Sequence, residues 1–169
     1  QPATTDINTL TLHDALPIYV LAYSLERSGD VAAARESRSK ARSSARNVDR
    51  FPYREDSEAP LAAAVAADPE DAVARHLLAC LLYHRERPAE AIRHWEAAVK
   101  AAPGDFSARR SLGLAYAEQS RPVAEAAAQL EKAIEVNPAH VRTLNDLSGI
   151  YARAGQFDQQ LVVLEKALR

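Results

Sequence analysis

Leucine and proline return at a nearly fixed interval through the second half of the chain. The steps are 34 and then 35 residues for both types, at Leu78, Leu112 and Leu147 and at Pro69, Pro103 and Pro138. A self-similarity of this length is typical of a solenoid. One repeat of this size cannot bury its apolar face alone, so neighbouring repeats must stack. The interval therefore predicts an all-α fold, a right-handed superhelical array of antiparallel helix pairs.

Within each interval, small and large side chains keep one order. The clearest copy reads Leu112, Gly113, Tyr116, Ala126, Ala133 and Pro138. This order resembles the tetratricopeptide repeat, with its Leu-Gly-x-x-Tyr, Ala, Ala and Pro frame. Weaker copies precede it, at Leu78, Ala79, Leu82, Ala91, Trp95, Ala98 and Pro103, and follow it, at Leu144, Leu147, Ser148, Tyr151, Gly155, Phe157, Leu164 and Ala167. The resemblance covers Ala72 to Arg169 and predicts units at 72–105, 106–140 and 141–169 within a continuous domain, 70–169.

The frame has a physical basis in helix packing. Small residues such as Ala98, Gly113 and Ala133 are expected where two helices cross, because they let the axes approach to roughly 8–10 Å. Large residues, including Trp95 and Tyr116, are expected to fill the space between layers. The prolines end each second helix, since proline cannot continue one.

Composition narrows the classes of function. The formal net charge is −2 and the pI is near 6.2, which argues against a nucleic-acid or anionic-membrane surface. No apolar run approaches the length of a membrane span. Cys80 is the single cysteine, which excludes an internal disulfide and favours a reducing compartment. We therefore expect a cytoplasmic location. The chain does not begin with methionine and contains none, which indicates a fragment of a longer protein.

The first part of the chain is less regular. The run from Thr9 to Ile18 resembles translated sequencing-adaptor sequence, so residues 1–17 are expected to form a leader that is not native; the alternative is an ordinary polar leader. Residues 18–49 predict a degenerate helical pair with its turn at Gly29 and Asp30, and with a solvated arginine face that includes Arg38 and Arg42. Residues 50–69 predict a loop and a helix that joins this pair to the array.

No catalytic motif occurs in the chain, which predicts that it is not an enzyme and needs no cofactor. The sequence has five scattered glycines and lacks a phosphate-binding loop, a Gly-x-Ser-x-Gly elbow and a His-Glu-x-x-His pair. A narrower resemblance runs from Phe51 to Leu164. It is to the repeat region of large bacterial proteins that also carry an uncharacterised, sugar-enzyme-like β domain, and it implies an accessory role beside chemistry located elsewhere.

The function favoured by the repeat frame is a protein-interaction scaffold. A preformed, curved groove suits an extended or helical peptide, because rigidity lowers the ordering cost of binding. The first helix of each unit is expected to line this groove, with Tyr83 and the arginines as anchors. The predicted groove residues are Val73, His76, Cys80, Tyr83, His84, Ser107, Arg110, Leu114, Glu118, Arg142, Asn145 and Arg153. The alternatives are the accessory role and a self-associating structural module.

A metal site is a further alternative on the first of these helices. His76, Cys80 and His84 follow one another at i, i+4 and i+8, and neighbouring members could share a zinc ion. The outer two are about 12 Å apart along a helix, so all three cannot bind one ion. Ligands from another helix would be needed, and the sequence dictates none. A groove lined by polar groups is the preferred interpretation.

The last helix carries four consecutive apolar residues, Leu161 to Leu164, which span more than one helical face. The repeat frame turns Leu161, Leu164 and Ala167 inward and leaves Val162, and with it Val163, without cover. An exposed apolar patch indicates a contact. We expect either a further helix of the parent protein or a dimer formed through Val162 and Val163.

Overall fold

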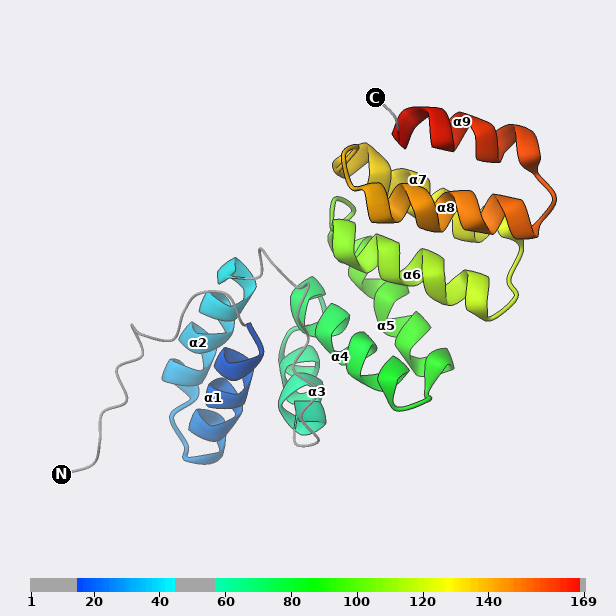
Figure 1. Cartoon of the computed structure of the whole chain (residues 1–169). Coiled ribbons are helices and arrows are strands. Elements are labelled where there is room, and N and C mark those ends of the chain that lie inside the picture. Colours follow the sequence, from blue (N-terminus) through cyan, green and yellow to red (C-terminus); the bar gives the residue numbers. More distant parts are fainter. Residues whose placement is uncertain (1–14, 45–56, 168–169) are drawn as a thin grey trace.

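The computed structural model describes residues 15–44 and 57–167, and all regular structure in these ranges is helical. The helices stack into an elongated array that runs from α1 and α2 at one end to α9 at the other (Figure 1). Their bounds are α1 (Ala15–Arg27), α2 (Val31–Ser44), α3 (Glu58–Ala67), α4 (Ala72–His84), α5 (Pro88–Ala101), α6 (Phe106–Glu118), α7 (Val123–Val136), α8 (Val141–Arg153) and α9 (Phe157–Ala167). The predicted all-α solenoid is confirmed.

Three antiparallel pairs, α4–α5, α6–α7 and α8–α9, have the same tight turn between their helices. The turn places one residue at positive φ, namely Glu86 at 56°, Ser120 at 55° and Gly155 at 69°. Gly29, at 91°, takes this place between α1 and α2. Glycine adopts such a conformation without a Cβ penalty, which explains its use in two of the four turns. The first pair is therefore built like the later ones, although its sequence match is weaker.

The first helix of each regular unit begins at a side-chain cap. Asp71 accepts a hydrogen bond from the backbone N–H of Ala74, and Asp105 accepts one from Ala108, each at 3.0 Å. In the third unit Nδ1 of His140 accepts from the backbone N–H of Thr143 at 3.2 Å. Each cap satisfies a donor that the helix leaves unpaired. The second helices end before Pro103 and Pro138, as the sequence predicts.

Fully buried alanines mark the helix crossings of the array: Ala34, Ala41, Ala79, Ala91, Ala98, Ala126 and Ala133. Gly113 has the tightest environment. A Cβ atom added there would lie 2.9 Å from Cγ of Leu130 and 3.0 Å from the carbonyl oxygen of Ala126. Only glycine therefore lets α6 approach α7 this closely, which confirms the role that the repeat frame assigns to small residues.

Replacing Ala98 with leucine should lower the free energy of unfolding by about 1–3 kcal/mol, because three further heavy atoms must enter a filled helix contact. Ala98 has no exposed surface. Urea unfolding followed by circular dichroism would measure the loss. Replacing the half-buried Ala97 with leucine is the matched control and should have a smaller effect. An unchanged midpoint for Ala98→Leu would mean that this residue is not at a helix crossing.

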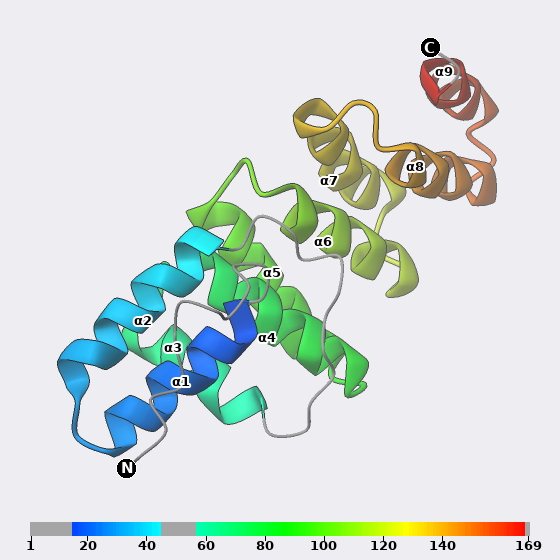
Figure 2. The same ribbon diagram turned by 60° about the vertical axis from the view of Figure 1, so that its left-hand side comes forward.

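The first helices of the units line the inner side of the array. The first helices of neighbouring units touch: α4 contacts α6, and α6 contacts α8. In the described part of the chain, the second helices are less closely joined, both α5 to α7 and α7 to α9. Because the first helices approach one another more closely than the second helices do, the stack curves toward the side of the first helices. Figures 1 and 2 show α4, α6 and α8 following one another along the array, and in Figure 1 α5 and α7 lie behind them.

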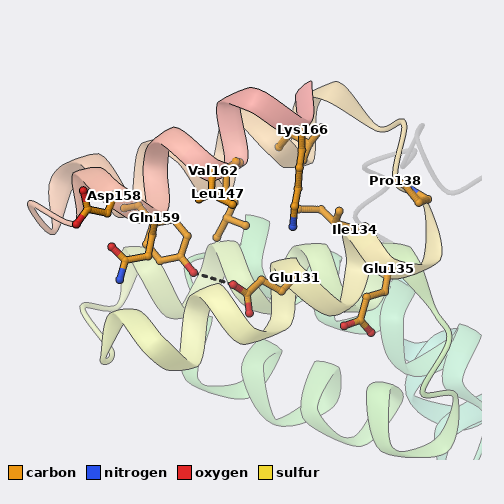
Figure 3. A pocket seen from close by; sticks show the side chains of 12 residues that line it. Glu131, Ile134, Glu135, Pro138, Leu147, Asp158, Gln159, Val162 and Lys166 are labelled. Carbon is orange, nitrogen blue, oxygen red and sulfur yellow. Dashed lines mark hydrogen bonds between the residues drawn. The ribbon is translucent and has the colours of Figure 1, made fainter. Parts of the chain in front are cut away.

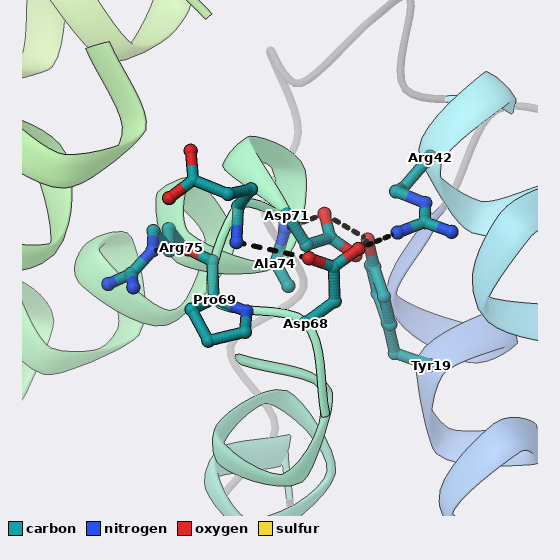
Figure 4. Close-up of polar contacts among 8 residues, drawn as sticks. Tyr19, Arg42, Asp68, Pro69, Asp71, Ala74 and Arg75 are labelled. Atoms are coloured by element: carbon teal, nitrogen blue, oxygen red, sulfur yellow. Dashed lines mark hydrogen bonds and ion pairs between the residues drawn. The ribbon is translucent and has the colours of Figure 1, made fainter. Parts of the chain in front are cut away.

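α3 lies between the first pair and the array, in contact with α1 and α4. A buried polar contact strengthens this junction (Figure 4). The hydroxyl of Tyr19 donates to the Asp71 carboxylate, at 2.9 and 2.8 Å from its two oxygens. Burial raises the pKa of both Tyr19 and Asp71, although the hydrogen bonds from Ala74 and Tyr19 lower the pKa of Asp71. The cap of α4 is thereby tied to α1.

The arginine face of α2 is not wholly solvated, which corrects the sequence prediction. Arg38 is buried and its Nη1 lies 3.0 Å from Oε2 of Glu26 on α1. Arg42 forms an ion pair with Asp68, beside the Tyr19–Asp71 contact (Figure 4). The predictions for residues 1–14 and 45–56, including the loop expected from residue 50, lie outside the described residues.

The register predicted for α9 is wrong for Leu161, Val163 and Leu164, whereas Ala167 packs against the core as predicted. Val163 is 5% exposed and belongs to the core, whereas Leu161 and Leu164 are 58% and 39% exposed. Leu161 and Leu164 occupy the repeat positions of Ala127 and Leu130, which are both buried in α7. No described helix stands beyond α9 to cover them. Val162 is exposed as predicted, at 52%.

The corrected register predicts different effects for two adjacent valines. Val163→Ala should cost about 1–2 kcal/mol of unfolding free energy through lost apolar burial, whereas Val162→Ala should change it by less than about 0.5 kcal/mol. Thermal and urea unfolding of the two variants would measure the difference. Equal effects would contradict the placement of Val163 in the core and Val162 outside it.

Candidate functional site on the inner face

A hollow of about 440 Å³ lies on the inner face between α6 and α8. Four of its lining residues were predicted from the sequence: Leu114, Glu118, Asn145 and Arg153. Ala117, Asp146 and Gly149 complete the lining. Gly149 stands 35 residues after Leu114, so the repeat register itself could have identified it. The hollow combines an apolar wall with an amide and both signs of charge.

Tyr83 and Glu118 meet on this face although they are 35 residues apart. The Tyr83 hydroxyl donates a hydrogen bond to the Glu118 carboxylate, joining the end of α4 to the end of α6. Burial and this carboxylate raise the pKa of Tyr83 to about 12, which keeps the hydroxyl protonated. The Tyr83 ring also packs against Trp95, with centroids 5.4 Å apart. Tyr83 is thus a rigid, half-buried aromatic at the edge of the face.

Arg110 is paired within the chain and is therefore not the free anchor for a ligand that the sequence predicts. Its guanidinium binds Oδ2 of Asp146, with Nη2 at 2.6 Å and Nε at 3.0 Å. Both side chains are about one quarter exposed, at 24% and 23%. The pair joins α6 to α8, so Arg110 fixes the spacing of two units rather than presenting a free charge. Arg142 and Arg153 are exposed and remain the accessible arginines of α8.

His76 is buried, at 3% exposed, and does not line a groove. The indole N–H of Trp95 donates to Nδ1 of His76 at 3.2 Å. Because Nδ1 accepts, the neutral imidazole carries its hydrogen on Nε2, which lies 3.6 Å from Sγ of Cys80 and donates to it. Burial lowers the pKa of His76 and raises that of Cys80 to about 12. Trp95, His76 and Cys80 therefore form a neutral, internal hydrogen-bonded chain.

This arrangement does not favour the alternative of a zinc site. Nδ1 of His76 is occupied by Trp95, and Cys80 is held as a thiol rather than a thiolate. The described residues contain no group of three His, Cys, Asp or Glu side chains that could share a metal ion. His84 lies on the exposed end of α4.

The other predicted groove residues are spread along the inner helices. Val73 and Ser107 are half-buried near the starts of α4 and α6, and Val73 packs against the core. Leu114 is half-buried, and Asn145 is exposed. The structure thus brings Leu114, Glu118, Asn145 and Arg153 together and leaves Val73 and His84 apart from them.

The family follows from comparison with known proteins. The tetratricopeptide repeat model matches residues 76–128 and 122–169, which together exceed half of the chain. The chain belongs to the tetratricopeptide repeat family. This match agrees with the paired helices, the small residues at their crossings and the terminating prolines.

Solved tetratricopeptide repeat structures share the fold of this chain. A crystal structure of MamA is 20% identical with a TM-score of 0.62, covering 92% of this chain and 77% of that chain. YrrB, described as a protein with an unusual peptide-binding site, is 24% identical with a TM-score of 0.61, covering 94% and 87%. An O-GlcNAc transferase mutant from Thermobaculum terrenum is 22% identical with a TM-score of 0.54, covering 81% of this chain but 22% of that one. These identities establish the fold alone.

Comparison with curated protein sequences gave no match. Nothing in the comparisons supports the resemblance to proteins with a sugar-enzyme-like β domain. In the described ranges, no helix has the length and apolar character needed to cross a membrane.

Proposed function

We propose that the chain is a protein-interaction scaffold that binds an acidic peptide segment on its inner face. The hollow between α6 and α8 carries this proposal. It offers an apolar wall at Leu114, an adaptable amide at Asn145 and a cation at Arg153. Arg142 stands exposed near the start of the same helix, α8. An apolar side chain of the peptide enters the hollow while its carboxylates meet these two arginines.

Rigidity of the inner face favours such binding. The Arg110–Asp146 pair holds α6 to α8, and the Tyr83–Glu118 contact holds α4 to α6. A ligand therefore meets a surface whose spacing is already set, which reduces the entropy lost on association. Peptide binding at an unusual site is attributed to YrrB, which has the same fold, and this supports the proposal by analogy.

Charge reversal of the two exposed arginines tests this function. A peptide selected from a display library against the full chain should lose affinity by about tenfold or more when Arg142→Glu and Arg153→Glu are combined. Helicity and melting temperature should remain unchanged, because neither arginine takes part in an ion pair among the described residues. Isothermal titration calorimetry would measure the affinity.

A matched reversal separates binding from folding. Arg35→Glu together with Arg93→Glu changes the same charge at exposed positions away from α8 and should leave the affinity unaltered. Arg110→Glu should instead destabilise the fold, since it would place a carboxylate beside Asp146. Equal loss of affinity for the Arg142/Arg153 and Arg35/Arg93 variants would mean that net charge, rather than the inner face, binds the peptide.

Self-association is a second candidate, favoured by the uncovered face of α9. Phe157, Leu161 and Leu164 follow at i, i+4 and i+7, and all three are exposed. A second copy of the chain would cover this row. Light scattering should then give a dimer that Leu161→Glu converts to a monomer. A monomeric wild type at high concentration would refute this candidate and leave the peptide proposal untouched.

A further inference from the structure

On the outer side of the array, a hollow of about 690 Å³ lies between α7 of the second unit and α9 of the third, over α8 (Figure 3). Its apolar wall is formed by Ile134, Leu144, Leu147, Val162 and Val163. Its polar lining includes the carboxylates of Glu131, Glu135 and Asp158 and a single ammonium group, Lys166. An apolar surface bordered by three acids and one base is complementary to a ligand that is both apolar and cationic.

The corresponding place at the boundary between the first and second units holds an arginine of the chain itself. Tyr116 donates its hydroxyl hydrogen to Oε1 of Glu96 at 2.8 Å. The guanidinium carbon of Arg121 lies 4.4 Å from the centre of the Tyr116 ring, and its Nη1 lies 3.5 Å from Oε1 of Glu96. The tyrosine and the glutamate thus form a binding site for a guanidinium group. The tyrosine ring attracts it by a cation–π interaction, and the glutamate forms an ion pair with it.

The boundary between the second and third units retains this tyrosine and glutamate, as Tyr151 and Glu131, but lacks the arginine. The Tyr151 hydroxyl donates to Oε1 of Glu131 at 2.8 Å, as that of Tyr116 does to Glu96. Gln156 stands in place of Arg121, and the backbone matches: the N–H of Arg121 donates to Tyr116 at 3.0 Å and that of Gln156 to Tyr151 at 2.9 Å. No ion pair joins Glu131 to a basic side chain within residues 15–44 and 57–167.

A second arginine of the second unit, Arg109, is also replaced in the third unit. In the second unit, Nε of Arg109 donates to the carbonyl of Pro103 at 2.5 Å, and its Nη1 donates to Gln129 at 3.1 Å. Its counterpart 35 residues later is Leu144, which is buried and faces the hollow. The boundary between the second and third units therefore combines a guanidinium site that lacks its arginine with an apolar side chain, Leu144, where the second unit has Arg109.

We propose that this outer hollow binds an arginine side chain of a partner protein, next to an aliphatic residue of the same segment. The guanidinium group packs against the Tyr151 ring and pairs with Glu131, as Arg121 does with Tyr116 and Glu96. The neighbouring aliphatic side chain enters the part lined by Ile134, Leu144 and Val162. This site is on the opposite side of the array from the inner face and is independent of it.

The test uses a defined probe on the full chain. The capped tripeptide acetyl-Leu-Arg-Leu-amide should cause saturable changes in the NMR resonances of Glu131, Tyr151 and Lys166. The same tripeptide with citrulline in place of arginine keeps the shape but loses the charge, and should bind at least about tenfold more weakly. Gln156→Arg should supply the missing guanidinium from within the chain and abolish the changes.

Gln119→Arg is the matched control, because it adds the same charge at another exposed position, just after α6, and should leave probe binding unchanged. Several results would overturn the proposal: equal binding of the citrulline probe, changes that persist in Gln156→Arg, or changes confined to Leu114 and Asn145. Concentration-dependent self-association that Gln156→Arg removes, without any response to the probe, would show that a second copy occupies the hollow instead.

Discussion

Trp95→Ala is expected to lower the free energy of unfolding by about 3–5 kcal/mol, the range for removing a large buried aromatic side chain. Trp95 is almost fully buried between α4 and α5 and packs against the ring of Tyr83. The variant also leaves Nδ1 of His76 without its donor, in a place that water does not reach. Urea unfolding followed by circular dichroism would measure the loss.

Trp95→Phe separates packing from hydrogen bonding. It retains most of the apolar area but removes the indole N–H, so it should cost about 1–3 kcal/mol, the penalty for an unsatisfied buried polar group. His76→Leu in the Trp95→Phe background should recover part of that loss, because it removes the orphaned acceptor. A cost below about 1 kcal/mol for Trp95→Ala would contradict the assignment of this residue to the core.

Asp71→Ala is expected to cost about 2–4 kcal/mol, the second largest effect. The carboxylate caps α4 through the N–H of Ala74, and loss of such a cap typically costs about 1 kcal/mol. It also accepts the buried hydroxyl of Tyr19, which would be left unpaired at a further cost of about 1–3 kcal/mol. Because Tyr19 belongs to α1, the junction between the first pair and the array should loosen.

Asp105→Ala provides the control for this variant. Asp105 caps α6 through Ala108 at the same 3.0 Å distance and accepts no tyrosine hydroxyl in the described structure. Its loss should therefore cost about 1 kcal/mol. The difference between the two variants isolates the Tyr19 contact, and hydrogen exchange in α1 should increase for Asp71→Ala alone. Equal costs would mean that the Tyr19–Asp71 contact does not stabilise the junction.

The repeat interval predicted much of the fold because a repeated position has the same neighbours in each unit. Ala91 and Ala126 are both fully buried, and Tyr116 and Tyr151 each donate to a glutamate at the same place. A position that recurs can be assigned without knowledge of the rest of the chain. The small residues at the helix crossings and the helix ends before Pro103 and Pro138 follow from this.

The predictions that are wrong concern positions at which one unit differs from the others. His76 shares its repeat position with Arg110 and Asn145, which reach the inner face, yet it is buried. The difference arises because Trp95 replaces the leucine found at 130 and its N–H needs an acceptor. Likewise, Val163 is buried on the same outer side as Leu144, which replaces Arg109. In each case two residues change together in one unit only. The repeat pattern of the sequence therefore cannot predict them.

The pairing of Arg110 with Asp146 illustrates a second limit. The two residues are 36 positions apart and come from neighbouring units, so neither shows from its own helix that it will meet the other. The sequence identified Arg110 as polar and on the inner side, but not that its charge is neutralised. By contrast, the exposed Arg142 and Arg153 kept the accessibility expected of them.

Mapping of the bound peptide by NMR tests the central claim most directly. A display-selected acidic peptide added to the isotope-labelled full chain should change the resonances of Leu114, Asn145, Gly149 and Arg153. Asn145→Trp, which fills the hollow between α6 and α8, should weaken its binding by about tenfold or more, while Gln156→Arg on the outer side should have no effect. Changes confined to α7 and α9, or full affinity in Asn145→Trp, would contradict a peptide-binding inner face.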